Sequence, residues 1–294
     1  MESIKVGKDI FNDQQARKRQ EDWYERFLDR AKCEVESQTI STSGGESHVL
    51  LAGDDSNPPL FCLHAMLTGS AHLLSEIWPL TDHYHLILPD IPGHSVKGIP
   101  HRFSYKTDAY TDWFLEIVSH FEAEKIRLMG VSLGGFIAHR FASKWPERVE
   151  RLVLIVPAGI VQASVVKGMM RMMVPMLRYR FNPNEENLKR LTGFLLSNWD
   201  DDWGPFLGDS MHDFITPKSI PPLASDEDLQ NLRMPALVIA ADQDISFPGE
   251  PMVKRVQNLV PNVETELMND TRHSPPTTPE FRTWLSDRLV KFFG

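Results

Sequence analysis

Residues 126–143 read IRLMGVSLGGFIAHRFAS, and the pentapeptide GVSLG at 130–134 lies at their centre. The apolar residues before it form a short run typical of a buried strand, whereas those after it recur at helical spacing. A strand that turns into a helix within one residue strains that residue and exposes its side chain. Flanking glycines leave room where strand and helix approach each other. This stretch therefore predicts a strand, a sharp turn at Ser132 and a helix.

Ser132 needs partners before it can act as a nucleophile, because a serine hydroxyl keeps its proton near neutral pH. A histidine base and a carboxylate that orients it would supply the activation. Asp244 follows an apolar strand predicted at 236–241, and His273 follows an alternating strand predicted at 263–268. The alternative is a serine in a glycine-rich turn without a role in chemistry. Asp244 and His273, each placed after a predicted strand, favour the catalytic interpretation of Ser132.

The chain resembles the α/β-hydrolase superfamily from about Leu60 to the C-terminus, with the order Ser, Asp, His expected on that sheet. Four spaced motifs carry the resemblance: His64-Ala65-Met66, Asp90 with Gly93 and His94, the turn around Ser132, and the D-x-x-x-P loop from Asp244 to Pro248. Ala65 stands where the family usually has glycine. The D-x-x-x-P spacing favours Asp244 over Asp242 as the acid that orients His273.

The resemblance implies an α/β-hydrolase fold, with a mostly parallel central sheet, helices on both faces and an inserted helical cap. It implies an oxyanion hole made by the backbone N–H groups of Met66 and Leu133, with His64 bracing that loop. The implied activity is that of a serine hydrolase. Ser132, His273 and Asp244 would cleave a carboxylic ester or related acyl substrate through an acyl-enzyme intermediate.

Several other functions share this fold. Carbon–carbon bond hydrolases, lactonases and perhydrolases use the same triad, and the sequence does not separate them from esterases. Haloalkane dehalogenases and epoxide hydrolases are excluded, since they need a carboxylate where Ser132 stands. A non-catalytic ligand-binding protein on the same fold is a further alternative. The presence of all three polar residues disfavours that alternative.

Composition narrows the class of protein. The 294 residues are 41% hydrophobic and 24% charged, which is typical of a soluble globular chain. The net charge of −9 argues against nucleic acid or an anionic membrane as the main partner. No run of signal-peptide or transmembrane length is present, and the two cysteines form no disulfide pattern, so we expect a cytoplasmic protein. Motifs typical of metal sites are missing, and we expect no metal and no cofactor.

The pattern along the chain predicts three parts. Residues 1–30 form an N-terminal helical extension, residues 31–157 and 227–294 form the hydrolase core, and residues 158–226 form the cap. Trp23, Tyr24, Phe27 and Leu28 share a face of the extension that docks on its own domain; a dimer contact and part of a lid are the alternatives. Within the core, further strands are predicted at 33–42, 48–52, 59–64, 85–90 and 151–157, and a helix at 108–123.

The predicted cap is rich in soft apolar side chains, including five methionines between Met169 and Met176. Together these residues would suit a small-molecule substrate with an apolar acyl group. Packing of the cap on the core is the alternative explanation for any single residue among them. Trp203 is the residue that we expect to contact the substrate.

Overall fold

The structure, a computed structural model, describes residues 10–163, 165–217 and 219–294, with side chains in the helix from Val165 described from residue 173 onward. In these residues the strands are β1 (Val35–Thr42), β2 (Gly45–Ala52), β3 (Pro59–Leu63), β4 (His85–Pro89), β5 (Ile126–Val131), β6 (Val149–Ile155), β7 (Ala236–Ala241) and β8 (Val263–Met268). The helices are α1 (Gln14–Arg30), α2 (Ser70–Ile77), η1 (Trp78–Asp82), α3 (Ala109–His120), α4 (Leu133–Lys144), η2 (Pro146–Arg148), α5 (Val165–Phe181), α6 (Glu185–Thr192), α7 (Trp203–Asp213), α8 (Asp226–Gln230), α9 (Gly249–Leu259) and α10 (Pro279–Phe293).

The strands form one sheet. Within the described residues it has eight strands in the order β1-β2-β4-β3-β5-β6-β7-β8. β2 runs antiparallel to β1 and β4, and the remaining pairs are parallel. The predicted mostly parallel sheet is confirmed. Because the carboxyl ends of parallel strands share one edge, the loops after β3, β5, β7 and β8 meet there.

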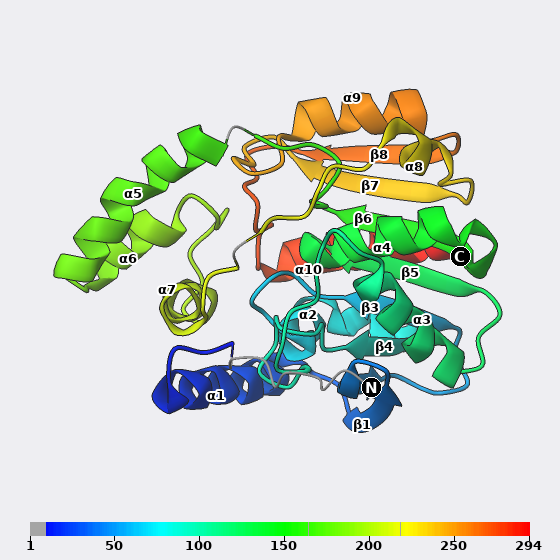
Figure 1. Ribbon diagram of the computed structural model, residues 1–294, viewed down its shortest axis with the longest axis horizontal. Helices are drawn as coiled ribbons and strands as arrows, with labels where there is room; N and C mark the ends of the chain where they lie inside the picture. Colours follow the sequence, from blue (N-terminus) through cyan, green and yellow to red (C-terminus); the bar gives the residue numbers. More distant parts are fainter. Residues whose placement is uncertain (1–9, 164, 218) are drawn as a thin grey trace.

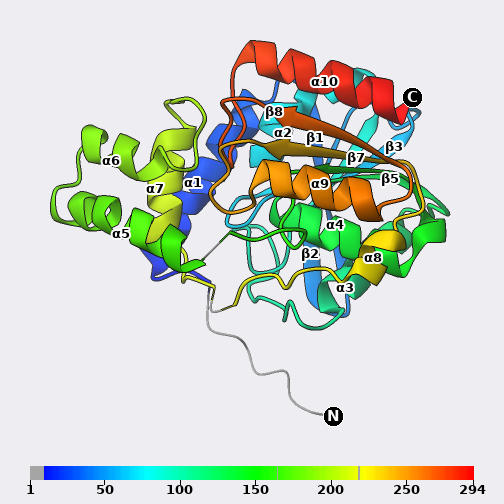
Figure 2. The same ribbon diagram turned by 90° about the horizontal axis from the view of Figure 1, so that it is seen from above.

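Helices cover both faces of the sheet, as Figures 1 and 2 show. Alternate residues of the central strands point to opposite faces. Leu128 and Leu152 belong to the apolar core under α3, α4, α8 and α9, whereas Met129 and Val153 belong to the core with α1, α2 and α10. Burial on both faces explains why these strands appear as continuous apolar runs in the sequence.

Helices α5, α6 and α7 lie to one side of the sheet, and α1 lies beside α7 (Figures 1 and 2). Tyr24 and Phe27 of α1 are buried, and the Phe27 ring lies 4.7 Å from that of Trp203, between centroids. Arg30 donates to Asp200 at 2.8 Å and to Asp202 at 2.7 Å. The predicted docking face of α1 therefore packs within its own chain, where α1 contacts both the core and the cap. Residues 1–9 of the predicted extension lie outside the described residues.

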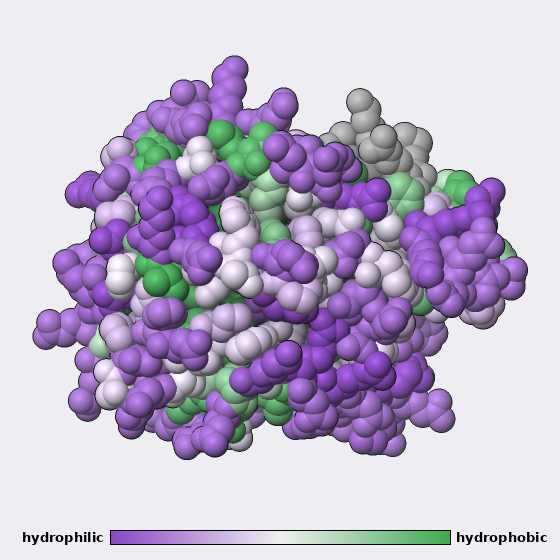
Figure 3. Space-filling view, turned by 180° about the vertical axis from the view of Figure 1, so that it is seen from behind, coloured by the Kyte–Doolittle hydropathy of each residue, from purple (hydrophilic) through white to green (hydrophobic). Residues whose placement is uncertain are grey.

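The face of the molecule seen in Figure 3 is mainly polar. In the view of Figure 3, hydrophobic side chains lie in small separate patches. Helix α5 exposes Met173, Met176 and Phe181, the last at 81% of its surface. No helix among the described ranges is both long enough and apolar enough to span a membrane.

A buried carboxylate connects several elements near the edge of the sheet where the parallel strands end. Asp90, at the end of β4, accepts hydrogen bonds from the Ser70 backbone N–H at 2.9 Å, the Tyr24 hydroxyl at 2.9 Å and the His48 ring at 2.8 Å. Burial alone would raise the pKa of Asp90, but its hydrogen bonds, first the one from His48, lower it below its ordinary value. This side chain therefore ties α1, β2 and the start of α2 to β4.

We predict that Asp90→Asn lowers the free energy of unfolding at neutral pH by about 2–4 kcal/mol, because buried donors lose their charged acceptor. Since the folded pKa is depressed, the Asp90 contribution is present above the unfolded pKa of about 3.9 and is lost as the pH falls through the folded pKa. Urea unfolding between neutral and acid pH measures both effects. The variant should lose less stability on acidification than wild type.

The exposed Asp55 offers a matched control, since Asp55→Asn removes one carboxylate without a buried network. Its unfolding curves should follow those of wild type at each pH. An Asp90→Asn protein as stable as this control would contradict the role given to Asp90.

Candidate active site

The turn between β5 and α4 places Ser132 at the edge of the sheet where the parallel strands end. Ser132 has φ 51° and ψ −108°, a conformation that L residues rarely adopt. Its backbone N–H donates to Ile155 at 3.0 Å, and its carbonyl accepts from Ala158 at 3.0 Å. The neighbouring strand β6 and the loop after it therefore hold the strained residue in place.

The glycines of the pentapeptide are needed for steric reasons. A Cβ atom on Gly130 would lie 2.3 Å from the carbonyl oxygen of Gly134, and one on Gly134 would lie 2.1 Å from that of Leu63. Both obstacles are backbone atoms, which cannot move aside as a flexible side chain can. Only glycine fits at these two positions without shifting β3, β5 or α4.

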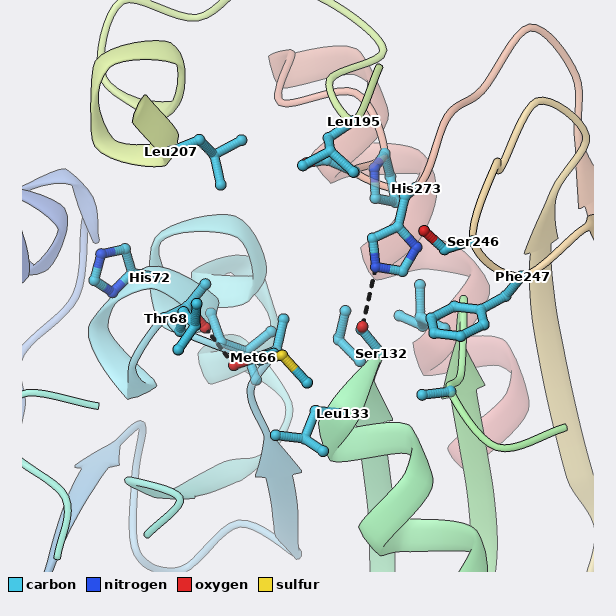
Figure 4. A pocket seen from close by; sticks show the side chains of 18 of the residues that line it. Met66, Thr68, His72, Ser132, Leu133, Leu195, Leu207, Ser246, Phe247 and His273 are labelled. Carbon is cyan, nitrogen blue, oxygen red and sulfur yellow. Dashed lines mark hydrogen bonds between the residues drawn. The ribbon is translucent and has the colours of Figure 1, made fainter. Parts of the chain in front are cut away.

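Ser132, His273 and Asp244 form a continuous chain of hydrogen bonds. The Ser132 hydroxyl donates to His273 Nε2 at 3.0 Å (Figure 4), and His273 Nδ1 donates to Asp244 Oδ2 at 2.7 Å. Ser132 and Asp244 are 6% and 4% exposed. The three residues come from loops after β5, β7 and β8, as the sequence predicts. The arrangement can move a proton from the serine hydroxyl to an oriented imidazole.

Asp242 and Asp244 have different partners. Asp244 Oδ1 accepts from the backbone of Ser246 and Phe247, while Oδ2 receives the His273 ring. Asp242 instead accepts hydrogen bonds from the backbone N–H groups of Thr271, at 2.9 Å, and Asp270, at 3.1 Å. Asp244 thus contacts the imidazole, and Asp242 holds the start of the loop at 269–278, called here the histidine loop.

Residues 64–69, the oxyanion loop, lie opposite the histidine. Met66 and Leu133 line the same cavity as Ser132, and no hydrogen bond in the described part of the chain uses the backbone N–H of either (Figure 4). The N–H of Gly134 donates to the His64 carbonyl at 3.1 Å. The oxyanion loop is therefore attached to the first turn of α4.

His64 braces the oxyanion loop, in agreement with the sequence prediction. Its Nε2 accepts from the Ile91 backbone at 2.8 Å, so Nδ1 carries the proton and donates to the Ala65 carbonyl at 2.7 Å. Burial lowers the pKa of His64 and favours this neutral form. The left-handed residue of the loop is Leu67, with φ 56°, and Ala65 is not among the described residues with positive φ. An alanine is accordingly accommodated at that position.

Ser132 opens into a cavity of about 490 Å³, within the usual range for small-molecule sites. The cap contributes Trp203, Leu207 and Met211 to its wall. Met173 and Met176 are instead more than half exposed. Of the methionines predicted in the cap, Met169, Met170 and Met172 lie outside the residues whose side chains are described. The expected contribution of the cap to an apolar pocket thus comes from α7 and from segments outside the cap helices, such as those with Leu195 and Leu223, and not from Met173 or Met176.

Two polar residues of α2, His72 and Glu76, also line the cavity. The sequence analysis did not identify them, because no motif marks either residue. Glu76 accepts from Trp203 Nε1 at 2.7 Å and from Arg282 at 2.8 Å. Burial raises its pKa, against the opposing effect of the arginine. The His72 ring lies between those of Phe27 and Phe206 in tilted contacts, and burial lowers its pKa to about 3.

Among the described residues, no group of three or more His, Cys, Asp or Glu side chains lies close enough together to hold a metal ion. Cys33 and Cys62 are both free thiols, and Cys62 is buried in the core as expected.

Known proteins resemble this chain over nearly its whole length. A carboxylesterase of Bacillus subtilis strain 168, named nap and described as uncharacterized, is 24% identical over 292 residues, covering 92% of this chain and 91% of the relative. Carboxylesterase YbfK of the same organism is 24% identical over 263 residues, covering 85% and 86%. The crystal structure of the naproxen esterase of Bacillus subtilis superimposes with a TM-score of 0.78 at 21% identity, covering 94% of this chain and 97% of that one.

The family model of the alpha/beta hydrolase fold matches residues 58–277. This match spans the oxyanion loop, the serine turn, the cap and the histidine loop. Together with the carboxylesterase relatives, it identifies the protein as a hydrolase. The chain belongs to the alpha/beta hydrolase fold family.

Proposed function

We propose that the protein hydrolyses carboxylic esters through an acyl-enzyme intermediate, with Ser132, His273 and Asp244 as its catalytic triad. The observation that carries this proposal is the unbroken relay from Asp244 through His273 to Ser132 at the wall of an apolar cavity. The carboxylesterase relatives support the same substrate class.

Acylation begins when the Ser132 hydroxyl attacks the ester carbonyl carbon. His273 Nε2 accepts the hydroxyl proton, and Asp244 stabilises the imidazolium that forms. When the tetrahedral intermediate collapses, the bond to the leaving alcohol breaks, and His273 returns the proton to that alcohol. Water then enters, gives a proton to His273 and attacks the acyl-enzyme. The carboxylic acid leaves, and Ser132 regains its proton.

The oxyanion of each tetrahedral intermediate is bound by the backbone N–H groups of Met66 and Leu133. Backbone donors held by rigid elements need no reorganisation as charge develops, which makes them effective in the transition state. The N-terminus of α4 adds a favourable dipole at the same place.

The cavity favours an ester with apolar groups. Leu207 and Met211 from the cap line this space together with Ser132, and Figure 4 shows Leu207 pointing into it. Their apolar surface gains from burial against an acyl or aryl group, at about 25 cal/mol per Å². Trp203 closes part of the same wall, and we assign it to substrate binding.

Replacing the nucleophile tests the mechanism directly. We predict that Ser132→Ala lowers kcat on p-nitrophenyl esters at least about 10⁴-fold, since no other group can form the acyl-enzyme. It should also abolish covalent labelling by a fluorophosphonate, measured by intact mass. Wild-type turnover or labelling in the variant would refute Ser132 as the nucleophile.

The two acidic residues should respond differently. Asp244→Asn is expected to lower kcat by about 10⁴-fold, because the amide favours the wrong imidazole tautomer. Asp242→Asn keeps one oxygen acceptor for the histidine loop and should cost no more than about tenfold. Steady-state kinetics of both variants on one ester provides the comparison. A larger loss for Asp242→Asn would reverse the assignment.

Substrate contact by Trp203 predicts a selective effect on KM. Trp203→Ala should raise KM for p-nitrophenyl hexanoate by about tenfold, through lost apolar contact, while KM for p-nitrophenyl acetate changes little. Trp203→Phe retains an aromatic ring and serves as the matched control. Equal changes for the long and short ester would argue against contact with the acyl group.

A further inference from the structure

The segment between α6 and α7 runs alongside the histidine loop. The Ser274 N–H donates to the Leu195 carbonyl at 2.8 Å, and the Ser197 N–H donates to the Ser274 carbonyl at 3.2 Å. Leu196 and Ser274 thereby form an isolated parallel bridge. The predicted cap is therefore joined by backbone hydrogen bonds to the residue that follows His273, and Leu195 lies near His273 in Figure 4.

The hydroxyl of Ser197 adds contacts on both sides of the histidine. It donates to the Ser274 carbonyl at 2.6 Å and accepts from the Arg272 backbone N–H at 2.9 Å. One oxygen atom thus bridges the two residues that flank His273. The Arg272 guanidinium also donates to the Leu196 carbonyl at 3.0 Å, so both neighbours of the histidine are bonded to the same cap segment.

Other hydrogen bonds hold the histidine loop on either side of the histidine, and beyond Ser274 the Thr277 N–H donates to Asn198 of the same cap segment at 3.0 Å. Asp242 holds its beginning through the N–H groups of Asp270 and Thr271, and Asp270 has the unfavourable φ of 51°. From Arg272 to Ser274 the loop has no helix or strand of its own, apart from the bridge to the cap. The core therefore fixes the loop before the histidine, and Ser197 fixes it at the histidine.

We propose that Ser197 is a positioning residue for His273, supplied by the cap, so that productive proton transfer depends on a seated cap. This inference rests on the proposed triad. Without the bridging hydroxyl the loop can shift, and the 3.0 Å bond between Ser132 and His273 lengthens or bends. Ser197 is not among the described residues that line the cavity. Its loss should therefore affect chemistry and leave substrate binding unchanged.

The test compares Ser197→Ala and Ser197→Thr in the full chain with wild type. Ser197→Ala should lower kcat by about 10- to 100-fold, the scale expected when a catalytic group is misplaced by about 1 Å, with KM nearly unchanged. Fluorophosphonate labelling of Ser132 should slow by a similar factor. Ser197→Thr retains the hydroxyl and should recover most of kcat.

Thr192→Val is the matched control. Its hydroxyl is buried in the cap and donates within α6, to the Leu188 carbonyl at 3.0 Å. This variant should lower the thermal unfolding midpoint at least as much as Ser197→Ala while keeping wild-type kcat. The comparison distinguishes a fall in kcat caused by a less stable cap from one caused by a displaced His273.

The outcomes are distinguishable from failure of the proposed function. If Ser197→Ala retains wild-type kcat while Ser132→Ala is inactive, the triad stands and the positioning role is wrong. The positioning role is equally wrong if Ser197→Ala raises only KM, if Ser197→Thr fails to recover activity, or if Thr192→Val loses as much kcat. An active Ser132→Ala protein overturns the proposed function itself.

Discussion

The backbone can turn from β5 into α4 at Ser132 because two glycines let main-chain atoms approach more closely than any Cβ would permit. Gly134 packs against the Leu63 carbonyl, and Gly130 packs against Gly134. Hydrogen bonds to Ile155 and from Ala158 hold the strained serine. The position of the hydroxyl follows from this close contact, and the other catalytic groups are arranged to meet it.

Three separate parts of the chain support the relay. The core holds the acid loop and the start of the histidine loop, through Asp244 and Asp242. The oxyanion loop is bonded to α4 itself. The cap is bonded through Ser197 to Arg272 and Ser274, which flank the histidine, and the cap in turn is joined to α1 by Arg30. Support from several parts of the chain suits preorganised catalysis, because groups that are already fixed in position need no rearrangement during the reaction.

Much of the fold could be predicted, because its signals are local. Alternating and continuous apolar runs gave the strands, and the end of each strand indicated where polar loop residues would gather. The N-cap at Thr278, which accepts from Phe281, and Pro279 at the start of α10 also follow from local chemistry. Pairs such as Arg30 with Asp200, separated by 170 residues, have no such signal. Met173 and Met176 are about half exposed and do not line the cavity, which the richness of the cap in methionine could not reveal, because composition does not say which side of a helix is covered.

The sequence by itself determined the mostly parallel sheet and the serine turn; it pointed to Ser132 and His273, and it favoured Asp244 over Asp242 as their partner. Strand periodicity and glycine sterics act over a few residues, so they can be recognised without coordinates. Only the tertiary structure decided that Asp244 contacts His273 while Asp242 braces its loop, that α7 lines the cavity, and that Ser197 bridges the neighbours of the histidine. Those contacts join segments far apart in the chain, and their distances depend on how the cap packs against the core.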